Sequence, residues 1–200
     1  MIQILGCTLK TRGAQTACFS LVACGSWQVF KASSLFPLHT YLYAMKILMV
    51  CLGNICRSPL AEGILQEKVL HAGLPWIVDS AGTNGFHVGE HPHPLSIKVA
   101  KEHGIDISAQ VARRFVREDL DRFDMIYAMA ADVLEEIKNI SAIGFDEQKV
   151  VLFLNELYPG KDMDVPDPWY GPEPGYHAVF ELIDRTCTAI IEKYSMTRAS

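Results

Sequence analysis

The residues with the clearest chemical potential are Cys51 and Arg57, which are separated by five residues in the segment CLGNICRSP. A cysteine thiolate is a strong nucleophile, and a nearby cation or helix N-terminus lowers the pKa of the thiol from about 8.5 to about 3.5–7.5. An arginine guanidinium is always charged and can donate to two phosphate oxygens at once. The pair therefore predicts nucleophilic attack on a phosphorus atom whose oxygens are held by Arg57.

The segments on either side of Cys51 and Arg57 indicate how the two side chains are positioned. A continuous apolar run, Ile47–Val50, precedes the cysteine and is typical of a strand buried on both faces of a parallel sheet. The pair Ser58–Pro59 follows the arginine and favours the start of a helix, whose unpaired N–H groups bind anions. Gly53 allows the loop between them to turn with its own N–H groups pointing inward, as in an anion-binding nest.

A purely structural interpretation is the alternative. Cys51 and Cys56 would then be small buried apolar residues, and Arg57 would be a solvated cation. That interpretation suits a lone cysteine at the end of a strand. It is not favoured here, because the cysteine, the arginine and the Ser-Pro pair occur together between an apolar strand and a helix.

The segment Cys51–Pro59 closely resembles the signature of the low-molecular-weight protein tyrosine phosphatases, and the resemblance extends over residues 45–194. It implies that the phosphoryl group of the substrate is bound by the loop residues Leu52, Gly53, Asn54, Ile55, Cys56 and Ser58. It also implies that Asn54 and Ser80 share a hydrogen-bond network that shapes the loop, and that Ser58 donates to the Cys51 thiolate. Gln110 stands where some members of the family place a histidine in this network.

A phosphatase also has to protonate the leaving oxygen, and the best candidate acid is Asp167, which lies between two prolines. A positioned acid accelerates such reactions by about 10²–10⁴-fold. The prolines restrict the backbone and would hold the carboxyl group in place. The stretch Asp167–Gly171 resembles the family's Asp-Pro-aromatic-Tyr-Gly segment, whose aspartate is the general acid, although Trp169 replaces the more usual tyrosine. Trp169 and Tyr170 would line one side of the cleft and Phe86 the other.

The composition is that of one globular domain with a hydrophobic core, since the chain has 200 residues of which 50% are hydrophobic. A net charge of −5 argues against nucleic acid as the main partner. No run of about eighteen apolar residues occurs, so no membrane-spanning helix is expected.

The first 44 residues differ from the rest and mark a boundary near Met45. They contain three basic residues and no acidic one, whereas the remainder carries a net charge of −8. Three interpretations compete for this leader: a transit peptide, a lipoprotein signal around Leu21–Cys24, or an upstream extension with the true start at Met45. We favour the third, with residues 1–44 disordered and residues 45–200 forming the phosphatase-like domain, because the apolar part of the leader is short and interrupted.

The cysteines predict a reducing compartment. Three of the six lie in the leader, at positions 7, 18 and 24, so the domain has no disulfide framework. Cys51 and Cys56 are close enough in sequence to couple by oxidation, which would block a nucleophilic thiolate. The expected location is therefore the cytoplasm.

Beyond the loop, strands and helices alternate about four times along the chain. Helices are predicted at residues 59–71, 94–103, 117–123, 130–140 and 176–194, and strands at residues 76–80, 125–129 and 150–154, with a long loop at 160–174. This order predicts an α/β fold, a three-layer sandwich with a four-stranded parallel sheet and right-handed crossovers. Ligands of such sheets bind at the carboxyl ends of the strands, which is where the phosphate-binding loop follows the first strand.

These observations predict a protein tyrosine phosphatase that hydrolyses phosphotyrosine through a phosphocysteine intermediate, without a metal or another cofactor. Its partner is then a tyrosine-phosphorylated protein. Ile55 favours this substrate, since phosphoarginine-specific members of the family carry threonine between the asparagine and the second cysteine.

Two alternatives belong to other classes of protein. A thioredoxin-coupled arsenate reductase shares the fold and the loop but requires two further redox cysteines, whereas only Cys187 follows Cys56. A catalytically idle phosphopeptide-binding module is the second alternative. The joint presence of Cys51, Arg57 and Asp167 argues against it.

Three other groups of polar residues have weaker claims to chemistry. The pair of histidines in His91–His93 has metal-ligand spacing but lacks a third ligand, and the aspartates in Asp162–Asp164 do not follow the first strand as a magnesium-binding pair would. The arginines in residues 113–117 form a small basic cluster. We interpret this cluster as a solvated face or as an anion contact at the rim of the site.

Overall fold

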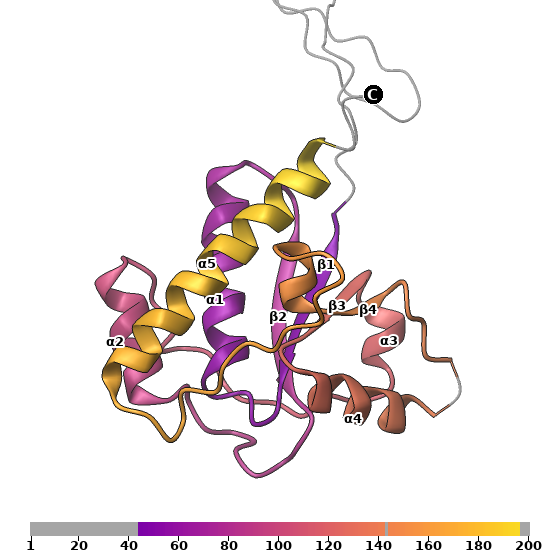
Figure 1. Ribbon diagram of the computed structural model, residues 1–200, viewed down its shortest axis with the longest axis horizontal. Helices are drawn as coiled ribbons and strands as arrows, with labels where there is room; N and C mark the ends of the chain where they lie inside the picture. The colour runs from indigo at the N-terminus through magenta and orange to yellow at the C-terminus, as the bar shows by residue number, and fades with distance from the viewer. Residues whose placement is uncertain (1–43, 143, 197–200) are drawn as a thin grey trace, which may run out of the picture. The chain divides into compact units, whose positions relative to one another are not determined.

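The computed structural model describes residues 44–142 and 144–196, and their framework is a parallel sheet of four strands (Figure 1). The strands are β1 (Lys46–Cys51), β2 (Ile77–Gly82), β3 (Met125–Ala128) and β4 (Val150–Leu152), and their order in the sheet is β2-β1-β3-β4. In register, Cys51 pairs with Gly82 and Val50 pairs with Ala128. The first strand is thus central, which explains why Ile47–Val50 reads as an unbroken apolar run.

Helices cover both faces of this sheet, as the alternation of strands and helices predicts. They are α1 (Arg57–His71), α2 (Pro94–Glu102), α3 (Asp119–Arg122), α4 (Ala131–Ser141) and α5 (Glu173–Met196), with a short 3₁₀ helix, η1 (Phe153–Glu156), after β4. In Figure 1, α1, α2 and α5 lie on one side of the sheet and α3 and α4 on the other. The predicted three-layer α/β sandwich is confirmed.

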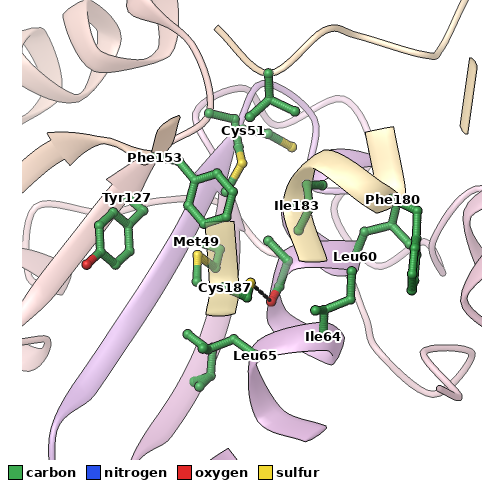
Figure 2. Packing of buried hydrophobic residues seen from close by; sticks show 14 of the residues in the cluster. Met49, Cys51, Leu60, Ile64, Leu65, Tyr127, Phe153, Phe180, Ile183 and Cys187 are labelled. Carbon is green, nitrogen blue, oxygen red and sulfur yellow. Dashed lines mark hydrogen bonds between the residues drawn. The ribbon is translucent and has the colours of Figure 1, made fainter. Parts of the chain in front are cut away.

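The side chains of β1 point alternately into two separate hydrophobic cores, one on each face of the sheet. Ile47 and Met49 pack with α1, α2 and α5, whereas Leu48 and Val50 pack with α3 and α4. Figure 2 shows the first core, in which Met49, Leu60 and Ile64 gather around α5. Cys187 of α5 is fully buried there, and its Sγ lies 3.9 Å from the carbonyl oxygen of Ala61 on α1.

Several predicted element boundaries are wrong in detail, among them those of α1, α5 and β4. Helix α1 begins at Arg57 rather than Pro59, and the side chain of Ser58 does not cap it. Helix α5 begins at Glu173 rather than Tyr176, which shortens the predicted loop. The last strand ends at Leu152, because the backbone turns into η1 at Phe153 instead of continuing to Leu154.

The interpretations of the leader fall on residues 1–43, which lie outside the described part of the chain, so the domain boundary near Met45 stays a prediction. Within the described residues, no helix combines the length and the apolar character needed to cross a membrane.

Candidate active site

The loop Leu52–Cys56 joins the carboxyl end of β1 to the N-terminus of α1 and closes tightly against β2. Asn54 has a φ of 57°, in the left-handed region that few side chains adopt. A Cβ atom on Gly82 would lie 2.9 Å from backbone atoms of Leu52, Gly53 and Asn54. Glycine at position 82 therefore leaves the room in which the loop turns.

The thiol of Cys51 is buried, and hydrogen-bond donors surround it. Its Sγ is 3.0 Å from Ser58 Oγ, and the backbone N–H of Asn54 donates to it at 3.2 Å. Helix α1 begins at Arg57, so the partial positive charge of its N-terminus lies at the same place. The three features place hydrogen-bonding groups and partial positive charge around the Cys51 sulfur, and the contact with Ser58 is the one that the family resemblance implies.

Asn54 connects the loop to β2 through its side-chain amide. Its Nδ2 donates to Ser58 Oγ at 2.9 Å and to Ser80 Oγ at 2.8 Å, while its Oδ1 accepts from the backbone N–H of Arg113 at 2.9 Å. The Asn54 side chain is 2% exposed, so these bonds satisfy it fully. The structure thus brings together the residues expected to shape the loop.

Glu62 on α1 extends this network and was not anticipated from the sequence. Ser80 Oγ donates to Glu62 Oε2 at 2.6 Å, and burial raises the pKa of the Glu62 carboxyl to about 7. Gln110 does not bond to Asn54, and its Oε1 is buried without a hydrogen-bond partner among the described residues. The position that some relatives fill with histidine therefore takes no part in the network here.

Arg57 and Asp167 lie in contact although 110 residues separate them. The Nη2 of Arg57 donates to Asp167 Oδ2 at 2.7 Å, and Nη1 donates to the carbonyl of Val165 at 3.3 Å. Val165 in turn donates its N–H to the carbonyl of Met129, directly after β3. The loop that carries the candidate acid is therefore anchored to the sheet, and its carboxylate lies at Arg57, the candidate phosphate clamp.

A cavity of about 280 Å³ opens between the loop after β1 and the loop that carries Asp167. Its floor is formed by Cys51 and Arg57 together with Leu52, Gly53, Ile55 and Cys56, whereas Asn54, Ser58 and Ser80 lie buried in the network described above. Its walls carry Phe86, Trp169 and Tyr170, the three aromatic residues expected at the cleft. Phe86 and Tyr170 are 85% and 94% exposed, so both are free to contact a substrate.

Two histidines pack against the ring of Trp169, and the sequence alone predicts neither contact. The ring centroids of His87 and His93 lie 5.4 Å and 5.2 Å from that of Trp169. His87 also lines the cavity and contacts Glu90 at 2.8 Å. His93 stacks on Tyr176, and its backbone N–H donates to Ile55 at 2.7 Å, while burial lowers the pKa of its imidazole. Through His93, these contacts connect the ring of Trp169 to the loop Leu52–Cys56.

The other residues considered for chemistry are Cys56 and the histidines at positions 91 and 93, and their surroundings favour structural roles. Burial raises the pKa of the Cys56 thiol to about 12, so it stays protonated beside Tyr176. His91 lies against the carbonyl of Gln110, apart from the ring contacts of His93. No group of three histidine, cysteine, aspartate or glutamate residues in the described ranges is arranged to bind a metal ion.

A parallel α/β sandwich with a buried cysteine, a loop N–H directed at its sulfur and an arginine at one helix N-terminus is the arrangement of a cysteine-dependent phosphatase. The family model described as low molecular weight phosphotyrosine protein phosphatase matches residues 46–199. The chain belongs to this family, and it is a phosphatase that works through a phosphocysteine intermediate. The predicted family, fold class and type of enzyme are confirmed.

Individual relatives support the same assignment. The low molecular weight phosphotyrosine protein phosphatase of Schizosaccharomyces pombe is 38% identical over 144 residues, which cover 70% of this chain and 91% of the relative. A crystal structure of a protein tyrosine phosphatase from Entamoeba histolytica is similar with a TM-score of 0.71 at 34% identity, covering 78% of this chain and 99% of that one. A Drosophila arginine phosphatase is similar with a TM-score of 0.70 at 30% identity, covering 75% of this chain and 98% of that one.

Proposed function

We propose that this chain removes the phosphoryl group from phosphotyrosine in proteins, with Cys51 as nucleophile, Arg57 as phosphate clamp and Asp167 as proton donor. The observation that carries the proposal is the 2.7 Å contact between Arg57 and Asp167. It places a carboxyl group beside the arginine of the loop that holds the Cys51 thiol.

In the first step the Cys51 thiolate attacks phosphorus in line with the bond to the tyrosine oxygen. The S–P bond forms as the P–O bond breaks, and Asp167 gives its proton to the departing phenolate. The equatorial oxygens are held by Arg57 and by the backbone N–H groups of the loop, where charge develops in the transition state. The products of this step are the dephosphorylated tyrosine side chain of the substrate protein and a phosphocysteine on the enzyme.

In the second step water attacks the phosphocysteine from the side that the phenol has left. The Asp167 carboxylate takes a proton from this water, and the S–P bond breaks to release inorganic phosphate. Ser58, 3.0 Å from Cys51 Sγ, donates a hydrogen bond to the departing thiolate. The second step thus restores the thiolate and the protonated acid.

The preference for an aromatic phosphoester rests on the residues around the mouth of the cavity. Ile55 offers an apolar branched side chain on the floor, and Phe86, Trp169 and Tyr170 provide flat apolar surfaces on the walls. None of the four side chains offers a carboxylate or amide to a guanidino group. The names of the curated relatives point to phosphotyrosine, whereas one structural relative is an arginine phosphatase, so these four side chains carry the argument.

The arsenate reductase alternative is weakened by the environment of Cys187. That residue is the only cysteine after Cys56, and it is fully buried between α1 and α5, where burial raises the pKa of its thiol well above the ordinary value. A redox relay needs an accessible thiolate. The two further redox cysteines of such a reductase therefore have no counterpart in this chain.

The test uses three matched peptides that carry phosphotyrosine, phosphoarginine or phosphoserine at one position. We expect kcat/KM for phosphotyrosine to exceed that for phosphoarginine by about tenfold or more, with almost no turnover of phosphoserine. The variant Cys51→Ser should lose at least about 10³-fold in kcat while still binding phosphate, since Arg57 and the loop remain. Faster turnover of phosphoarginine would refute the substrate assignment, and substantial turnover by Cys51→Ser would refute the mechanism.

A further inference from the structure

The basic cluster of residues 113–117 divides into side chains with different roles. Arg113 donates to Asp79 at 2.8 Å and to Asp119 at 3.0 Å, so its charge is used within the domain. Arg114 is exposed, and no carboxylate of residues 44–142 or 144–196 lies within ion-pair distance of its guanidinium. Arg114 therefore presents a charge that the fold itself does not employ.

Arg114 lines a second hollow, of about 370 Å³, which adjoins the active-site cavity. The two share Asn84 and Phe86 as lining residues. Thr83, at the near end of the hollow, donates its N–H to the carbonyl of Cys51, and Asn84 donates to that of Leu52, both at 3.0 Å. The wall between hollow and cavity is thus bonded directly to the phosphate-binding loop.

Phe86 forms the ridge between the two spaces. Its backbone N–H donates to Asn84 Oδ1 at 3.3 Å, a local turn that holds the ring outward, where it is 85% exposed. Covering an exposed aromatic ring with an extended peptide buries apolar surface and stabilises the complex with that peptide. An extended chain advances about 3.3–3.6 Å per residue, and because the cavity and the hollow share Asn84 and Phe86 as lining residues, a residue near the phosphotyrosine in sequence is the one to reach the hollow.

The other charged group in the hollow is already engaged. Glu136 of α4 is half-buried, and its carboxylate accepts a hydrogen bond from the Thr83 hydroxyl. Glu136 keeps its negative charge, but one of its oxygens is taken up by Thr83, whereas the exposed guanidinium of Arg114 makes no ion pair or hydrogen bond with residues 44–142 or 144–196. An acidic side chain suits this position, because a guanidinium and a carboxylate form a two-point ion pair.

We propose that this hollow is a substrate subsite, in which Arg114 binds an acidic residue one or two positions from the phosphotyrosine while Phe86 packs against the intervening peptide. The inference rests on the proposed function and names a class of substrate for the same site: phosphotyrosine in an acidic sequence.

The experiment measures kcat/KM for phosphotyrosine peptides that differ only in a Glu, Gln or Lys placed one or two residues before or after the phosphotyrosine. Each value is divided by the kcat/KM of the same enzyme for an aryl phosphate, which occupies only the catalytic cavity. For the full chain we expect Glu to exceed Gln by about two- to fivefold on at least one side, and Lys to fall below Gln. The preference should shrink at about 0.5 M salt, since exposed ion pairs are screened.

Three variants assign the effect to Arg114. Arg114→Gln should abolish the preference for Glu, and Arg114→Lys should retain part of it because the charge remains. Lys101→Gln removes a cation from an exposed position on α2 and should leave the preference as it is. Thermal unfolding of each variant shows whether the fold is intact, and Arg114→Lys covers the case in which the glutamine variant is unstable.

Equal values for Glu and Lys peptides with the full chain would overturn the subsite, as would a preference that survives Arg114→Gln. A failure of the proposed function would look different. In that case the full chain would not hydrolyse the aryl phosphate, or Cys51→Ser would hydrolyse it as well as the full chain does.

Discussion

Asp167 contacts the guanidinium that we propose as the phosphate clamp, and a proton donor at this place should matter most for substrates with poor leaving groups. We predict that Asp167→Asn lowers kcat for phenyl phosphate by about 10²-fold or more, and lowers kcat for a nitrophenyl phosphate much less. The nitrophenolate leaves without a proton, which is the reason for the difference. Steady-state kinetics with both esters would decide. An equal loss on both would mean that Asp167 positions other groups and that the acid lies elsewhere.

The raised pKa of the Glu62 carboxyl makes the stability of the fold depend on pH. Burial raises the pKa of its carboxyl from about 4.5 to about 7, so between these values the folded state binds more protons than the unfolded state. Its contribution to stability is complete below about pH 4.5 and is lost as the pH rises through 7. The facing groups Ser80 and Arg113 favour the ionised form, and Asp79 opposes it.

We therefore expect the free energy of unfolding to fall by about 1–3 kcal/mol between pH 5 and 8, relative to Glu62→Gln, which does not titrate. Urea unfolding of both proteins at the two pH values measures the difference. If both proteins show the same change with pH, the Glu62 carboxyl is already ionised at pH 5 in the folded state.

At this scale the sequence predicts the candidate catalytic residues that the structure brings together, but not the side chains that support them. Cys51 and Arg57 belong to a short continuous motif in which the chemistry can be read from residue types. Glu62 lies off the apolar face of its helix, as a solvent-facing residue would, yet its carboxylate accepts hydrogen bonds from Ser80 of β2 and from Gln66. His87 comes from a glycine-rich loop without periodicity, so only the fold reveals its contact with Trp169.

Among the structural elements, β2 shapes the active-site loop through Gly82. A Cβ atom there would lie 2.9 Å from loop backbone atoms, which cannot move aside as a flexible side chain can. We predict that Gly82→Ala displaces the loop, lowers kcat/KM by about tenfold or more, and destabilises the fold by about 1–3 kcal/mol.

The matched control is Gly175→Ala, because a Cβ atom at position 175 meets no atom within 4 Å. It should leave kcat/KM unchanged and keep or slightly raise the melting temperature. Kinetics and thermal unfolding of the two variants test the claim together. Full activity in Gly82→Ala would show that the loop tolerates the extra methyl group.

The strands and helices themselves follow closely from the sequence, because buried parallel strands and amphipathic helices leave strong patterns. Boundaries are less predictable where a side chain has a second use. The sequence favours a cap at Ser58, yet the hydroxyl of Ser58 lies against the Cys51 thiol and the helix begins at Arg57, two residues before the predicted start at Pro59. The strand order in the sheet depends on contacts between distant segments, which no local pattern records.

For the molecule as a whole, the cysteines of the domain remain the basis for expecting a cytoplasmic enzyme, and that location stays a prediction. Cys51, Cys56 and Cys187 are free thiols in the structure. Among the described residues, the buried cores and the candidate active site are both formed by residues from Met45 onward. In the described ranges, the buried residues of the two cores run from Met45 to Ile190, and the site residues from Cys51 to Tyr170.

We predict from this distribution that a chain beginning at Met45 folds and works like the full chain. The backbone of Met45 accepts a hydrogen bond from Ile77 at 2.9 Å, so the shortened chain keeps the first contact between β1 and β2. Its melting temperature should stay within about 2 °C of the full chain, which is less than the shift expected from 1 kcal/mol in a domain of this size. Its kcat/KM for an aryl phosphate should also be unchanged. A large loss of melting temperature would mean that residues before Met45 pack on the domain, and a loss of activity alone would mean that they act at the site.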